Sequence, residues 1–127
     1  MSETALLALN EFCAAVVCNA VPATSPLQEQ GDERLLFWRF GKRLIRKMDW
    51  TPSTDPAEAM VVLAKCAQKR AEAWDIHRPD ATLVIHAPHP VWDNKWVIMS
   101  DAEGTIIATG ETLPLAICKF AKEIFSK

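Results

Sequence analysis

A chain of 127 residues, half of them hydrophobic and 24% of them charged, has the length and composition of one folded domain, residues 1–127. This composition excludes an intrinsically disordered chain, which would contain fewer apolar residues and a larger net charge. The net charge of −2 argues against a protein that coats nucleic acid, because such proteins carry a basic excess that neutralises phosphates.

The N-terminal residues 4–21 predict a helix that is apolar nearly all round. The acidic residues Glu3 and Glu11 argue against a secretory signal peptide, which begins with positive charge. The apolar run is also too short and too interrupted to span a bilayer, so we expect a cytoplasmic protein without membrane contact. Such a helix must be covered, either by a sheet or by a second subunit of a homo-oligomer.

Residues 22–31 contain two prolines and predict a polar loop, and Asp32 is a suitable N-cap for a second helix that reaches about Met48. One side of this helix would carry seven apolar residues, which are Leu36, Phe37, Trp38, Phe40, Leu44, Ile45 and Met48. The other side would carry four basic residues at helical spacing, which are Arg39, Lys42, Arg43 and Arg46. This basic side is either a solvated face or a surface that binds a phosphate backbone, a nucleotide or an acidic protein surface.

A third helix is predicted from Asp55 to about Asp75. Its start combines an N-cap aspartate, a proline at the first helical position and an acid in capping-box order at Glu58. The predicted buried stripe consists of Met60, Ala64, Ala67, Ala71 and Trp74.

Three short runs, 81–86, 95–100 and 105–109, predict strands, because they are rich in β-branched or aromatic residues. Residues 101–104 predict a hairpin turn, and residues 87–93 a longer connection. A final helix is predicted from about 112–114 almost to the C-terminus, with Leu113, Ile117, Phe120 and Ile124 as its stripe. The predicted fold class is α/β (α+β). An N-terminal helical pair (1–48) precedes a helix, three-stranded antiparallel sheet, helix (αβββα) sandwich (49–127) with both helices on one face.

Two stretches, DWTPSTDPAEA at 49–59 and ATGETLPLAICK at 108–119, carry a resemblance to a known family. They resemble the phage ABA sandwich domain of small tailed-phage and prophage proteins, over roughly residues 49–125. The resemblance implies an αβ sandwich and a phage or prophage gene. It implies no shared activity, so it transfers no functional residue.

The predicted element order is also similar to that of a double-stranded-RNA-binding domain. Those domains grip phosphates with lysines at the start of the last helix. Here residues 112–115 read TLPL and follow Glu111, so that phosphate grip is missing.

Chemical signatures are sparse. His86, His89 and Asp93 could supply zinc ligands, but they lie on a strand end and a proline-kinked loop with no nearby cysteine, so we predict no metal site. The four cysteines, Cys13, Cys18, Cys66 and Cys118, form no C-x-x-C pair and predict reduced, buried thiols. No converging catalytic set is evident, so we predict neither an enzyme nor a cofactor.

Tryptophans are common anchors at interfaces. We expect Trp38, Trp74 and Trp96 in the core, and Trp92, beside prolines in a loop, on the surface. The predicted binding residues are therefore Arg39, Lys42, Arg43, Arg46 and Trp92.

The sequence favours a non-enzymatic phage or prophage accessory protein that binds a host protein and modulates or inhibits a host process, such as a defence system. One alternative is a nucleic-acid-binding module with the same basic residues. Another is a protein that sequesters a small phosphorylated ligand, such as a nucleotide, between subunits.

Overall fold

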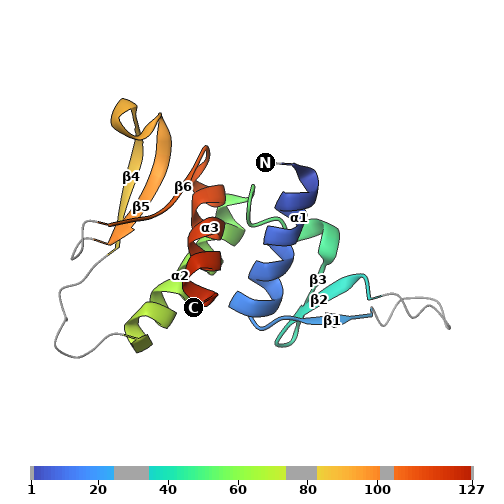
Figure 1. Cartoon of the computed structure of the whole chain (residues 1–127). Helices are drawn as coiled ribbons and strands as arrows, with labels where there is room; N and C mark the ends of the chain where they lie inside the picture. The colour runs from blue at the N-terminus through green and yellow to red at the C-terminus, as the bar shows by residue number, and fades with distance from the viewer. Residues whose placement is uncertain (1, 25–34, 74–82, 101–104, 127) are drawn as a thin grey trace.

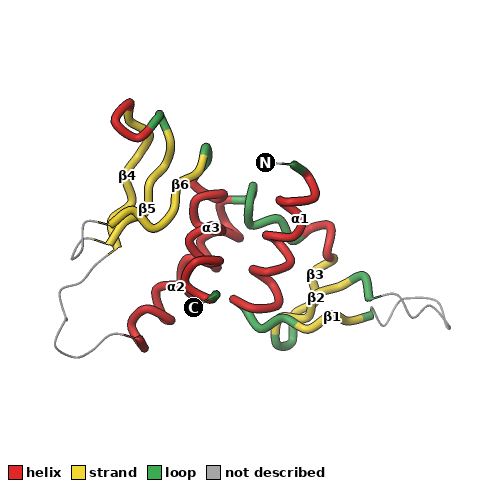
Figure 2. The backbone as a smooth tube through the Cα atoms, viewed as in Figure 1, coloured by secondary structure: helices red, strands yellow, loops and turns green. Residues whose placement is uncertain are grey.

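The computed structural model describes residues 2–24, 35–73, 83–100 and 105–126. Three helices lie in the middle, with one three-stranded antiparallel sheet on each side (Figures 1 and 2). The helices are α1 (Glu3–Phe12), α2 (Pro56–Ala73) and α3 (Leu113–Phe125). One sheet comprises β1 (Val21–Ala23), β2 (Phe37–Phe40) and β3 (Arg43–Arg46). The other comprises β4 (Leu83–His89), β5 (Lys95–Ser100) and β6 (Thr105–Gly110).

The predicted helix over residues 32–48 is wrong. Residues 37–40 and 43–46 pair as antiparallel strands, with Trp38 opposite Ile45. Gly41 opens the two-residue turn with a φ of +62°, a conformation that glycine adopts without steric cost. The N-terminal helical pair is therefore one helix followed by a small sheet. The proposed N-cap Asp32 lies outside the described residues.

The predicted first helix is present but shorter than expected. Ser2 caps α1, and a π-helical turn, Cys13–Val17, continues it. Asn19 then takes a left-handed φ of +54°, and the chain turns into β1. The buried residues Leu9, Cys13, Ala14 and Val17 join the core, because α1 and the π turn pack on α3 and the π turn also contacts α2.

The start of α2 agrees with its prediction, because the Asp55 side chain accepts hydrogen bonds from the backbone N–H groups of Ala57 and Glu58. The predicted stripe is wrong. Ala59, Val62 and Cys66 are fully buried, whereas Met60 is 53% exposed and Ala64 and Ala67 are also exposed. The side chains of residues 71 and 74 lie outside what the structure describes.

The final helix and the second sheet follow the predicted order. Thr112 caps α3 by accepting a hydrogen bond from the Leu115 N–H, and Ile117 and Phe120 are buried as predicted. Helix α3 packs on β5 and β6, and α2 packs on α3. The structure thus shows a mixed fold of helices and antiparallel sheets, and the αβββα sandwich with both helices on one sheet face is not confirmed. The predicted turn 101–104 lies outside the described residues.

The four cysteines are free thiols from three helical segments. Burial raises the pKa of Cys66 to about 12 and that of half-buried Cys18 to about 11. A hydrogen bond with Cys118, together with burial, raises the pKa of Cys13 well above its ordinary value. The raised pKa values keep the thiols of Cys13, Cys18 and Cys66 protonated near neutral pH. The described residues contain no group of three or more His, Cys, Asp or Glu side chains placed to hold a metal ion.

Candidate functional site

The β2–β3 hairpin separates the four predicted basic residues. Arg39 pairs with Leu44 across the strands, and Arg46 pairs with Phe37. Because side chains alternate along a strand, Arg39 and Arg46 share one face, whereas Arg43 shares the other face with Trp38. Lys42 lies in the turn. The four side chains therefore form no single ridge.

The inner face of this sheet is anchored to α1 through Trp50, which is 3% exposed. The Trp50 ring packs on Phe40 with 4.7 Å between ring centroids, and its Nε1–H donates a 2.9 Å hydrogen bond to the backbone carbonyl oxygen of Asn10. The Asn10 side-chain oxygen accepts a 3.0 Å hydrogen bond from the Ser53 N–H. These contacts fix the hairpin on the helical layer and leave its opposite face outward.

The outward face consists of two rows of side chains that cross all three strands. One row is Val21, Arg39 and Leu44, and the other is Ala23, Phe37 and Arg46. Val21 is 48% exposed, Leu44 is 37% exposed and both arginines are exposed. We call these six residues the hairpin-sheet face. Each row presents one guanidinium group between or beside apolar side chains.

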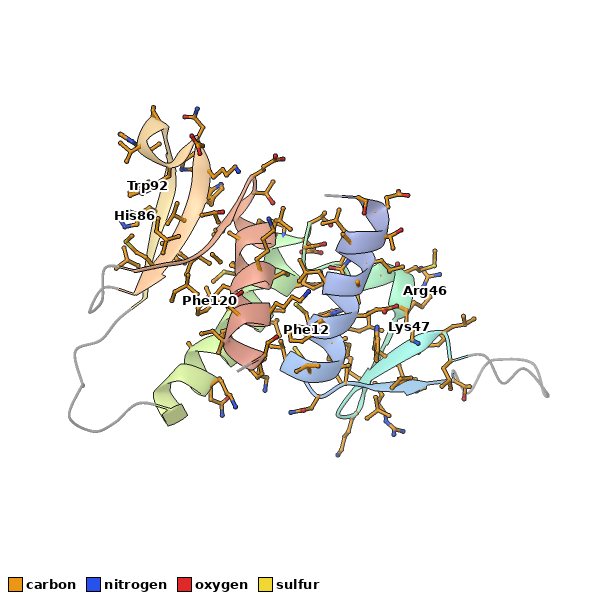
Figure 3. The ribbon with its side chains drawn as sticks, in the orientation of Figure 1. Phe12, Arg46, Lys47, His86, Trp92 and Phe120 are labelled. Carbon is orange, nitrogen blue, oxygen red and sulfur yellow. The ribbon has the colours of Figure 1, made fainter. Side chains whose placement is uncertain are left out.

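Neighbouring groups modulate the charge of this region. The Arg46 Nε–H donates a 2.7 Å hydrogen bond to Asp49 Oδ2. The two side chains are 58% and 50% exposed, so water weakens this ion pair. The Lys47 ammonium lies 4.7 Å from the centroid of the Trp38 ring (Figure 3 labels Arg46 and Lys47). Arg39, by contrast, is exposed and lies at the centre of its row, between Val21 and Leu44.

Arg43, on the same sheet face as Trp38, is close enough to Glu58 of α2 to affect the charge of its carboxyl group. Burial raises the pKa of the Glu58 carboxyl group, and the nearby Arg43 acts in the opposite direction. Glu58 Oε1 accepts a 2.8 Å hydrogen bond from the Thr51 N–H, which closes the turn before α2. Arg43 therefore favours the charged form of the Glu58 carboxyl group, and it lies on the opposite sheet face from Arg39 and Arg46.

Trp92 lies in the short 3₁₀ turn Pro90–Trp92 at the tip of the β4–β5 hairpin, far from the arginines (Figure 3). It is half-buried rather than fully exposed, because its ring packs 4.5 Å from the His86 ring and 6.0 Å from the His89 ring. Val91 beside it is 74% exposed. The structure therefore does not bring Trp92 together with the basic residues.

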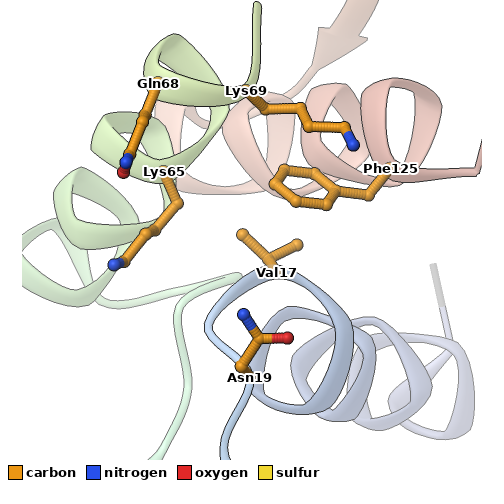
Figure 4. Close-up of a pocket in the computed structure, with 6 residues that line it drawn as sticks. All are labelled: Val17, Asn19, Lys65, Gln68, Lys69 and Phe125. Carbon is orange, nitrogen blue, oxygen red and sulfur yellow. The ribbon is translucent and has the colours of Figure 1, made fainter. Parts of the chain in front are cut away.

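A further feature had no signal in the sequence. A hollow of about 200 Å³ lies where the π turn, α2 and α3 meet (Figure 4). Its lining residues are Val17, Asn19, Lys65, Gln68, Lys69 and Phe125. They come from three separate stretches of the chain, so only the packing of the helices assembles them.

None of the helices in the described ranges is both long enough and apolar enough to cross a membrane. No protein-family model, curated protein or solved structure matches the chain.

Proposed function

We propose that this chain is a non-enzymatic binding protein that recognises an acidic, partly apolar surface of another protein through the hairpin-sheet face. The observation that carries the proposal is the row Val21, Arg39, Leu44, in which an exposed arginine stands between two exposed apolar side chains. Arginine next to apolar groups is typical of protein interfaces. The apolar side chains would lose water on binding, and the guanidinium would pair with a carboxylate through two parallel hydrogen bonds.

A protein partner fits this face better than nucleic acid does. Interfaces with nucleic acid are much more positively charged than interfaces between proteins. The hairpin-sheet face holds four apolar side chains and two arginines, and one of these arginines already pairs with Asp49. The apolar positions would gain nothing from a phosphate backbone.

The resemblance of residues 49–59 and 108–119 to the phage ABA sandwich domain supports a phage or prophage origin. We therefore propose a host protein as the partner, in the cytoplasm of the host cell, and a modulating or inhibiting effect on a host process such as defence.

Site-specific photo-crosslinking tests the proposal. A benzophenone amino acid replaces Leu44 on the hairpin-sheet face or, as a control, Val91 at the far β4–β5 tip. After irradiation in nuclease-treated host lysate, the Leu44 variant should give one defined adduct that the Val91 variant does not give. Identical adducts from both positions would contradict a specific face.

The host protein identified in the adduct is then purified on its own and titrated with the chain without the benzophenone residue. Arg39→Glu should weaken binding about tenfold or more, as removal of a central interface arginine does, whereas Lys95→Glu on the other sheet should not. Equal affinity of the two variants would contradict the proposal. An adduct that forms only in a parallel lysate without nuclease treatment would instead indicate the nucleic-acid alternative.

A further inference from the structure

The hollow between the π turn, α2 and α3 has the chemistry of an anion site. Lys65 and Lys69 are one helical turn apart on α2, and both are exposed. The described lining also contains the side-chain amides of Asn19 and Gln68, and it contains no carboxylate. Ammonium and amide N–H groups are all donors, so an acceptor with several oxygen atoms would satisfy them.

The donors come from two parts of the fold, α2 and the residue Asn19 after the π turn. The Lys69 ammonium lies 5.6 Å from the centroid of the Phe125 ring, which holds it at one side of the hollow. Lys65 and Gln68 border the other side, as Figure 4 shows. Asn19, which has a left-handed φ of +54°, follows the π turn. Like charges one turn apart on a helix repel each other, and a bound anion would remove this repulsion.

The hollow also has an apolar side. Val17 and the ring of Phe125 lie next to each other between the polar groups (Figure 4). The volume of about 200 Å³ is smaller than the roughly 300–1,000 Å³ of sites for drug-sized ligands. A ligand that fills the hollow would therefore be small and would combine one strongly anionic group with one ring or short apolar chain.

We propose that this hollow binds a small organic phosphate. Its phosphate oxygens accept hydrogen bonds from Lys65 and Lys69 and from the amide of Gln68 or Asn19, and its apolar part contacts Val17 and Phe125. This site shares no residue with the hairpin-sheet face, so its test does not depend on the proposed protein partner.

Titration of the full ¹⁵N-labelled chain with phenyl phosphate, followed by NMR, tests the proposal. Inorganic phosphate serves as a second probe. Saturable shifts of amide signals from residues 17–19, 65–69 and 125 are expected, with tighter binding of phenyl phosphate than of inorganic phosphate. Absence of saturable shifts up to about 10 mM phenyl phosphate, roughly ten times a Kd of 1 mM, would overturn the proposal.

Three variants that each remove one positive charge refine the test. Lys65→Met and Lys69→Met keep the apolar stem and change exposed residues, so the rest of the spectrum should be unaltered. Each should raise the Kd of phenyl phosphate about tenfold or more, the effect of losing a charge-assisted hydrogen bond. Lys95→Met on β5 should leave the Kd unchanged. Equal Kd values for all three variants, or equally tight binding of both probes, would overturn the assignment of an organic phosphate.

Discussion

The indole Nε1–H of Trp50 donates a 2.9 Å hydrogen bond to the backbone carbonyl oxygen of Asn10, forty positions earlier in the chain. Both residues are buried, and Trp50 also packs on Phe40 of the hairpin sheet. One side chain thus joins α1, β2 and the turn that leads into α2. The orientation of the hairpin-sheet face depends on this contact.

Trp50→Phe removes the hydrogen bond and part of the packing volume. We expect it to lower the free energy of unfolding by about 1–3 kcal/mol, the range for a buried polar group that loses its partner. Urea denaturation measures the change. Trp92→Phe is the matched control and should cost less, because the Trp92 ring is only half-buried. Equal losses would contradict the anchoring role of Trp50.

Two glycines should respond differently to alanine. At Gly41 a new Cβ meets no atom within 4 Å, so Gly41→Ala pays only for the positive φ, about 1–2 kcal/mol. At Gly110 a Cβ would lie 2.6 Å from the Ala116 backbone nitrogen, so the start of α3 would have to move away from β6. Gly110→Ala should therefore lower the melting temperature more than Gly41→Ala does. The reverse order would contradict the described turn and packing.

The Glu58 carboxyl group predicts a defined pH dependence of stability. Its pKa in the folded chain is raised above the ordinary value of 4.5, mainly by burial. The folded state therefore binds the proton more tightly than the unfolded state, and stability is lost as the pH rises from 4.5 through the raised pKa. Glu58→Gln removes this loss. Denaturation at several pH values should show the wild type losing stability relative to Glu58→Gln over this window.

Arg43 supplies the control for this pH dependence, because it lowers the pKa of Glu58. Arg43→Gln should shift the window to higher pH. A difference between the wild type and Glu58→Gln that does not change with pH would contradict the described environment of Glu58.

The cysteines should be unreactive in the native state. Cys13, Cys66 and Cys118 are 0% exposed, and raised pKa values keep the thiols of Cys13 and Cys66 protonated. An aromatic disulfide reagent at mildly alkaline pH should modify at most one thiol slowly, the half-buried Cys18, and all four after denaturation. Fast modification of two or more thiols in the folded chain would contradict their packing.

Self-association through the N-terminal helix stays a prediction. Leu7 on α1 is 55% exposed and Val16 on the π turn is 41% exposed. If these residues lie between subunits, Leu7→Asp should convert an oligomer to a monomer in sedimentation velocity experiments, and Leu44→Asp should not. A monomeric wild type, or an oligomer that survives Leu7→Asp, would exclude this interface.

The starts of α2 and α3 were predictable from the sequence, because helix caps act over a few residues. Asp55 and Thr112 bond to backbone N–H groups two or three positions ahead, so the signal and the structure lie within one helical turn. The strand Lys95–Ser100 was predictable for a similar reason, since β-branched and aromatic residues favour extended backbone locally.

The hairpin was not predicted, because its apolar residues fit a helical wheel as well as they fit two short strands. Trp38 and Ile45 are seven positions apart, which places them on one side of a helix, but they are also directly opposite each other across β2 and β3. The contact of Phe40 with Trp50, and of Trp50 with Asn10, favours the sheet. The contact of Trp50 with Asn10 joins residues forty positions apart, so no window of local sequence contains it.

The sequence by itself determined the caps of α2 and α3, the three strands β4, β5 and β6, and the identity of the basic residues. Tertiary structure decided which sides of the elements are buried. Helix α2 carries apolar residues on more than one side, and its packing on α3 and the π turn selects Ala59, Val62 and Cys66 for the core. The same packing places Lys65 and Lys69 beside Phe125, and the strand register separates Arg39 from Arg43. Caps and propensities act within a few residues, whereas burial depends on surfaces that only long-range packing brings together.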